Sequence, residues 1–179
     1  MPTIHVDEQV MVELKRQSNG RTPNDVIRGL LGLSVDDEEA IGPGVYLIPH
    51  GPKEFEDADE LRRWLSDRLA EDGEYLIASQ HYWRNVIPDS TCLFQKKKTV
   101  VGEGKMLGGL MPYSGEYISP ITGRPYAGIV HFAPASIKVY EKPISFAEAE
   151  KLLRKTLTFR GMQKLTLEDY EIIHKAGTE

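Results

Sequence analysis

Residues 81–126 hold the side-chain types that a nucleobase-binding site needs. Aromatic rings stack on a base, polar groups hydrogen-bond its edge, and cations contact phosphates. The candidates for stacking are Tyr82, Trp83 and Tyr113, and those for edge recognition are Asn85 and Asp89. The candidates for phosphate contact are Arg84, Lys96, Lys97, Lys98 and Arg124. This combination predicts nucleic-acid binding.

The same residues also have a purely structural interpretation. Tyr82 and Trp83 can be core aromatics that only pack. If Lys96–Lys98 continue a strand, the Lys97 side chain points away from its two neighbours. Lysines on a strand edge also protect a sheet from aggregation. The sequence leaves both interpretations open.

Catalytic patterns are scarce in the chain. The five histidines lie far apart without HxH or HExxH spacing, and the single cysteine, Cys92, lies in an apolar segment typical of a core strand. Asp89, Glu103 and Lys105 are the set that would suit a magnesium-dependent nuclease, because carboxylates hold the metal and a lysine orients water. A nuclease or restriction component therefore stays an alternative, while we expect no cofactor and no metal.

The formal charge of the 179-residue chain is −5, but the charges are unevenly distributed. Residues 34–74 hold 13 acids and four bases, whereas residues 84–164 hold 13 bases and six acids. Because salt screens fields over about 8 Å, the locally basic half matters more to a polyanion than the total charge. Since no long apolar run or basic leader pattern is visible, we expect a cytoplasmic protein without membrane contact.

The first 33 residues predict a small dimerisation module. Residues 3–7 alternate like a short strand, a helical pattern follows, and Thr22 and Pro23 open a second helix. Such a short segment cannot enclose its own core, so we expect a homodimer through residues 1–33. The segment resembles a ribbon-helix-helix unit and is similar to the N-terminal oligomerisation domain of the SeqA family. Strand residues Thr3, His5 and Asp7 would then be candidates for DNA contact, which leaves open a clasp or a DNA reader.

Residues 34–44 are acidic, end on Gly-Pro-Gly and predict a linker. The remaining chain, residues 45–179, predicts an α+β domain with flanking helices around a mixed β-barrel. We expect strands near 45–49, 75–79, 91–98, 99–107, 127–133 and 136–141. We expect helices that begin at Asp57 or Asp59, after Ser145 and after Thr166.

Three segments of this second domain resemble the PUA-like superfamily, which includes the EVE, ASCH and SRA domains. They are WRNVIP (83–88), FQKKKTVVGEGKML (94–107) and GIVHFAPASIKVYEKPIS (128–145). The resemblance implies a concave face that binds RNA or a modified base turned out of duplex DNA, with DNA the expected partner. A ribbon-helix-helix repressor whose second domain senses a small ligand is the other alternative.

Overall fold

The computed structural model describes residues 43–81, 83, 86–158 and 161–179. They belong to one compact unit, Pro43–Glu179. The predicted ribbon-helix-helix module and most of the predicted linker lie outside the described residues. No helix within those ranges is both long and apolar enough to span a membrane.

A five-stranded mixed sheet with the order β6-β4-β3-β1-β7 forms the centre of the unit. Its strands are β1 (Val45–His50), β3 (Thr91–Lys96), β4 (Thr99–Lys105), β6 (Lys138–Ser145) and β7 (Gln163–Leu165). Strands β1 and β3 run parallel, and the other pairs of this sheet are antiparallel. Apolar side chains lie on both of its faces, as expected where both faces are covered.

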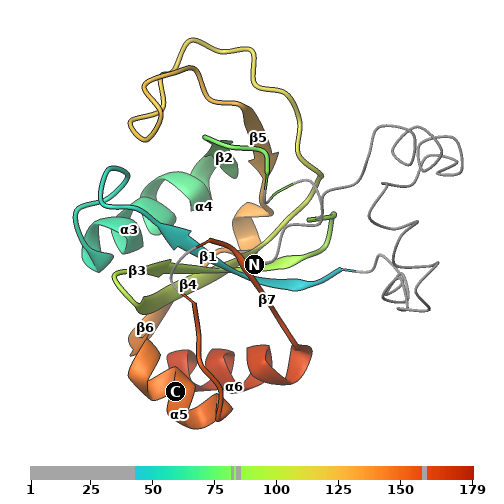
Figure 1. The fold of residues 1–179 in the computed structure, drawn as a ribbon. Coiled ribbons are helices and arrows are strands. Elements are labelled where there is room, and N and C mark those ends of the chain that lie inside the picture. The colour runs from blue at the N-terminus through green and yellow to red at the C-terminus, as the bar shows by residue number, and fades with distance from the viewer. Residues whose placement is uncertain (1–42, 82, 84–85, 159–160) are drawn as a thin grey trace, which may run out of the picture. The chain divides into compact units, whose positions relative to one another are not determined.

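Helices cover the two faces of this sheet (Figure 1). One face carries α3 (Ala58–Trp64), a π-helical turn (Leu65–Leu69) and α4 (Ala70–Asp72). Leu61, Leu65 and Leu69 repeat every fourth residue and are fully buried against it. The opposite face carries α5 (Phe146–Leu153) and α6 (Leu167–Thr178), which pack with a second group of core residues.

The predicted helix starts are confirmed by their caps. Asp57 Oδ1 accepts a hydrogen bond from the Glu60 backbone N–H at 2.8 Å, and Ser145 Oγ accepts one from Glu148 at 3.2 Å. At α6, Thr166 and Asp169 form a reciprocal capping box.

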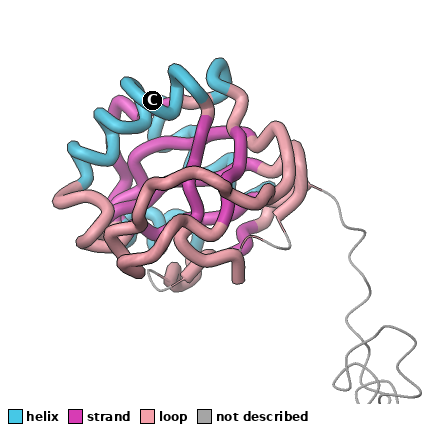
Figure 2. The backbone as a smooth tube through the Cα atoms, turned by 90° about the horizontal axis from the view of Figure 1, so that it is seen from above, coloured by secondary structure: helices cyan, strands magenta, loops and turns pink. Residues whose placement is uncertain are grey.

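A second, two-stranded sheet pairs β2 (Glu74–Ile77) with β5 (Gly128–His131). An isolated bridge between Met106 and Phe132 joins it to the end of β4. The connection from residue 106 to residue 127 arches over this ribbon (Figure 1), and long loops run along the side opposite the C-terminal helix (Figure 2). The α+β class is confirmed, and the strands expected to form a barrel are arranged as two joined sheets.

One local prediction differs from the structure, and one strand has no counterpart among the predictions. The run Lys96–Lys98 does not continue a strand, because β3 ends at Lys96 and the next two lysines form the turn before β4. Strand β7 was not predicted, since its three residues are too short to show alternation.

Candidate functional site

A cleft opens at the carboxyl ends of β1 and β3. The last residues of these two strands, His50 and Lys96, are register partners in the parallel pair. Because the chain leaves both strands at the same edge, the turns that follow can surround a ligand, as they do in α/β sheets. The topology therefore places the turn after β1 and the hairpin after β3 around one opening.

Aromatic side chains line a cavity of about 400 Å³ that reaches this edge of the sheet at His50 and is otherwise lined by residues from 54–76 and 117–126. The ring of Phe55 lies 5.4 Å from His50 and 5.5 Å from Trp64, measured between centroids. Trp64 in turn lies 5.9 Å from Tyr75. We call this cavity the aromatic cleft and define it by His50, Phe55, Trp64, Tyr75, Tyr117 and Tyr126.

His50 is a neutral, buried anchor of the aromatic cleft. Its Nδ1 lies 3.2 Å from the Gln95 carbonyl oxygen, and its Nε2 lies 2.9 Å from the Tyr75 hydroxyl. Burial lowers the pKa of His50 to about 4. A neutral ring donates through Nδ1 to the carbonyl, so Nε2 accepts the hydrogen bond of Tyr75. Burial also raises the pKa of Tyr75 well above its usual value, which keeps the hydroxyl protonated.

Two hydrogen bonds to the Gly51 backbone hold the turn after β1. The Gly51 carbonyl oxygen accepts a hydrogen bond from Lys96 Nζ at 2.6 Å, and the Gly51 N–H donates to Glu54 Oε2 at 2.5 Å. Burial raises the pKa of Glu54 and lowers that of Lys96, since both lose water. Lys96 is 1% exposed, so its ammonium positions the cleft wall and does not reach the surface.

The charged groups lining the aromatic cleft are mostly acidic. They are Glu54, Glu60, Asp72 and Glu74, with Arg68 as the single base among the described lining residues. Arg68 lies 3.9 Å from Asp72 and is paired with it. Such a lining disfavours a phosphate and favours an uncharged ring that presents hydrogen-bond donors.

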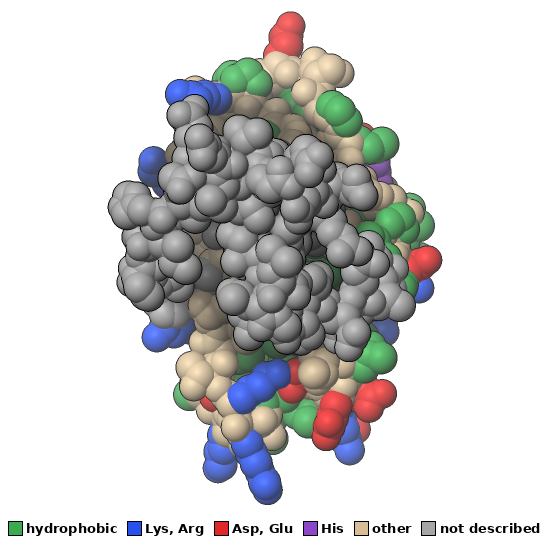
Figure 3. All heavy atoms as spheres, turned by 45° about the vertical axis from the view of Figure 1, so that its right-hand side comes forward, with side chains coloured by type: hydrophobic (Ala, Val, Ile, Leu, Met, Phe, Trp, Pro, Cys, Tyr) green, Lys and Arg blue, Asp and Glu red, His purple; other side chains and the backbone are tan. Residues whose placement is uncertain are grey.

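Basic groups gather beside the cleft instead. A second cavity of about 470 Å³ is lined by His50, the turn after it and residues 95–98. Lys97 and Lys98 form its tip and have φ angles of 48° and 62°, the backbone of a two-residue hairpin turn. Both residues are exposed, and we call this turn the lysine hairpin. On the face drawn in Figure 3, basic side chains lie at the left, lower and right margins of the described surface, and acidic ones at the top and right.

Trp83 lies in the core beside a third cavity. It is 6% exposed, and its ring lies 5.3 Å from Tyr75. It also lines a space of about 280 Å³ that shares Glu54 and Tyr75 with the aromatic cleft. Trp83 therefore packs in the core, next to the aromatic cleft.

The other candidate residues are distributed around the unit. Tyr113 packs edge to face on Tyr126 at 6.2 Å and so belongs to the cleft's surroundings. Arg124 is exposed on the long connection. Asp89 is not brought to the cleft, because it pairs with Lys105 at 3.1 Å near the other end of β4. Tyr82, Arg84 and Asn85 lie outside the described residues.

Sequence reasoning missed most of the aromatic cleft. His50, Glu54 and Phe55 come directly after a predicted strand, where polar residues often belong to a site. Trp64 follows the predicted helix start at Asp57 or Asp59, and Tyr75 begins the predicted strand 75–79. Nothing local indicates that these segments meet, since the parallel pairing that joins them is long-range.

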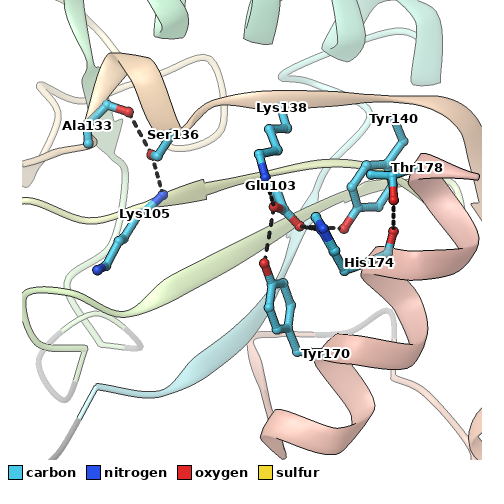
Figure 4. A network of polar contacts seen from close by, with 9 residues as sticks. All are labelled: Glu103, Lys105, Ala133, Ser136, Lys138, Tyr140, Tyr170, His174 and Thr178. Carbon is cyan, nitrogen blue, oxygen red and sulfur yellow. Dashed lines mark hydrogen bonds and ion pairs between the residues drawn. The ribbon is translucent and has the colours of Figure 1, made fainter.

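Glu103, the central carboxylate of the nuclease alternative, is enclosed by other side chains (Figure 4). It accepts hydrogen bonds from Tyr140 and Tyr170, at 2.8 and 3.2 Å, and lies 2.9 Å from His174 Nδ1. It is 4% exposed and docks α6 on the sheet. Among the described residues there is no group of three or more His, Cys, Asp or Glu side chains fit to hold a metal.

Solved structures share this fold although their sequences differ greatly. ASCH from Zymomonas mobilis matches with a TM-score of 0.50 and 10% identity, over 76% of this chain and 97% of that one. A hypothetical protein from Leishmania major matches with a TM-score of 0.52 and 15% identity, over 78% and 97%. No protein-family model and no curated protein matches the sequence. The described unit therefore has a PUA-like fold of the ASCH type.

Proposed function

We propose that residues 43–179 bind nucleic acid and hold an unstacked base in the aromatic cleft. The PUA-like fold is compatible with nucleic-acid binding. DNA is the polymer we favour, and a modified or mispaired base is the easiest to unstack from it.

The observation that carries this proposal is the adjacency of an aromatic cavity and a basic hairpin. The aromatic cleft and the cavity behind the lysine hairpin share His50. Stacking on aromatic rings contributes about 1–3 kcal/mol per base, and lysines attract the phosphates on either side of it. A bound nucleotide needs both contacts close together, because its base stacks on the rings while its phosphate lies near the lysines.

The charges of the cleft assign a part of the nucleotide to each region. Acidic residues in the aromatic cleft accept hydrogen bonds from amino or ring N–H groups of a base. Phosphates remain outside, near Lys97 and Lys98. The cleft therefore suits a base better than it suits a phosphorylated small molecule.

We also propose that the chain is a homodimer through residues 1–33. Two linked readers would raise the effective concentration of the second once the first is bound. Sedimentation of the full chain tests this directly, with a dimer expected. A monomer at tens of micromolar would remove the dimer and leave the base-binding proposal intact.

Salt-dependent binding to oligonucleotides tests the function. The double variant Lys97→Asn and Lys98→Gly removes both charges yet keeps residues that favour the positive φ of the turn. We expect the slope of log K against log salt to fall by about 1.4–1.8, the value for two lost phosphate contacts. Lys151→Ala with Lys175→Ala, on α5 and α6, removes the same charge from exposed positions elsewhere and should leave the slope unchanged.

Equal effects of the two double variants would show that only net charge matters. The absence of binding to every single-stranded, duplex and base-modified oligonucleotide would contradict the proposed function. Release from DNA on addition of a small metabolite would favour the sensor alternative, and magnesium-dependent cleavage would favour the nuclease.

A further inference from the structure

The aromatic cleft combines ring faces with negative charge. Its rings come from the end of β1, the turn after it, α3, β2 and the connection between β4 and β5. The same cavity is lined by the carboxylates of Glu54, Glu60, Asp72 and Glu74. Ring faces and carboxylates both attract positive charge, and proteins bind organic cations with this combination. The lining is therefore suited to a cationic ligand.

The backbone holds two of these carboxylates in place. Glu54 Oε2 accepts a hydrogen bond from the Gly51 N–H at 2.5 Å, and Glu60 Oε2 accepts one from the Glu56 N–H. Glu54 and Glu60 are both half-buried, so water and salt screen their charge less than at an open surface. Within the described part of the chain, no other group hydrogen-bonds to either carboxylate. The second oxygen of each is thus left to meet a ligand.

Two bases near these acids leave an excess of negative charge. Arg68, the single base among the described lining residues, is paired with Asp72 at 3.9 Å. Lys96 lies behind the cleft wall, with its Nζ on the Gly51 carbonyl oxygen, and offsets one further charge. Four acids against these two bases leave an excess of two negative charges. The lysine hairpin lines the neighbouring cavity instead.

The negative charge of Glu54 acts on two rings of the cleft. Burial, and after it the charge of Glu54, raises the pKa of Tyr75 well above its usual value. The same two causes raise the pKa of Tyr126. A potential that disfavours a phenolate favours a cation at the same place. The cleft therefore accepts an uncharged ring with hydrogen-bond donors better than a phosphate, and a positively charged ring better still.

We propose that the aromatic cleft prefers a base that carries a positive charge, as alkylation of a ring nitrogen produces. The inference rests on the proposed function and names the class of base that the cleft takes up. Alkylation at a pairing nitrogen also blocks base pairing, so such a base leaves a duplex more easily. A desolvated cation on an aromatic face gains roughly tenfold in affinity.

Two isomeric methylated bases separate the effect of charge from that of size. The probes are single-stranded DNA oligonucleotides with one central N1-methyladenine, which is cationic at neutral pH, or its neutral isomer N6-methyladenine. Single strands remove the difference in base pairing between the two isomers. We expect the full chain to bind the N1-methyl oligonucleotide at least about tenfold more tightly. Equal or reversed affinities would overturn the inference.

Substitutions that keep size and remove charge or ring test the cause of the preference. Glu54→Gln with Glu60→Gln removes two charges and keeps an oxygen that can accept each backbone hydrogen bond. We expect the preference for the cationic isomer to fall to about twofold or less. Phe55→Leu keeps an apolar side chain without a ring face and should lower the preference as well. Thermal unfolding checks that each variant is folded, and an unchanged preference in both would overturn the inference.

A matched control removes the same charge outside the cleft. Asp67→Asn with Glu71→Gln changes two exposed residues of the π-helical turn and α4 that are not part of the cavity lining. This variant should keep the preference of about tenfold. A fall as large as that of the Glu54 and Glu60 variant would make the preference an effect of net charge and overturn the inference.

The two proposals fail in different ways. If the wild type binds both isomers equally, the charge preference is wrong while base binding stands. If it binds no oligonucleotide, base binding itself is wrong. Binding of a trimethyllysine peptide together with no binding of either oligonucleotide would assign the cation to a protein and overturn both.

Discussion

Acidification should destabilise this protein through one buried histidine. His50 is neutral in the folded state, with its pKa lowered by burial to about 4, against 6.5 for an unperturbed side chain. As pH falls below 6.5, the unfolded chain takes up a proton at this position before the folded chain does. Proton uptake by the unfolded state favours unfolding, so stability present at neutral pH is lost between pH 6.5 and 4.

The size of this loss follows from the two pKa values. Each pKa unit corresponds to about 1.4 kcal/mol, so the full shift amounts to roughly 3 kcal/mol. At pH 5 the unfolded histidine is almost fully protonated and the folded one is still mostly neutral, which gives a loss of about 2 kcal/mol. A loss of this size is large against the 5–15 kcal/mol that typically stabilise a domain.

Urea unfolding at pH 7 and pH 5, followed by tryptophan fluorescence, measures the loss. Both tryptophans of the chain, Trp64 and Trp83, pack in the core of the described unit, so the signal reports its unfolding. His50→Gln removes the titrating group. Between pH 7 and pH 5, we expect the free energy of unfolding of this variant to fall by about 2 kcal/mol less than that of the wild type. Equal falls in the two proteins would refute the assignment of His50 as a buried neutral anchor.

Three further substitutions should lower stability at pH 7 in the same urea assay. Glu103→Ala leaves two tyrosine hydroxyls and a histidine without their acceptor and should cost about 2–4 kcal/mol; a loss below 1 kcal/mol would show that water replaces the carboxylate. Gly177→Ala places a Cβ 2.4 Å from the buried ring of Tyr140 and should cost about 1–3 kcal/mol despite the better helix propensity. Gly109→Ala, with open space around it, is its control, and equal effects would contradict the steric account. Thr166→Ala removes the side-chain cap of α6 and should cost about 1 kcal/mol, whereas no change would mean that the capping box is not needed.

Local chemistry explains how much of the fold was predictable. Ser145 and Thr166 are cap residues ahead of apolar stripes, and the structure uses both as predicted. The strands at Val45 and Thr91 are apolar runs bounded by turn residues, and they also formed. Their parallel pairing across some 40 residues left no local signal.

The candidate site was harder to predict because it depends on that pairing. The carboxyl ends of β1 and β3 bring His50 next to Lys96, and the crossover between them supplies Trp64 and Tyr75. Composition did indicate the aromatic and basic character of residues 81–126. It could not show that Trp83 and Lys96 are buried while Lys97 and Lys98 are exposed, since burial depends on where β3 ends.

Photocrosslinking tests the central claim, that the aromatic cleft holds a base, most directly. The full chain would be irradiated with DNA oligonucleotides that carry one 5-iodocytosine or 5-iodouracil, and the crosslinked residue identified by mass spectrometry. We predict crosslinks to the rings of the cleft, above all Tyr75, Trp64 and Tyr126, which competing unlabelled DNA abolishes. Crosslinks confined to α5, α6 or the Asp89 end of β4 would contradict the account.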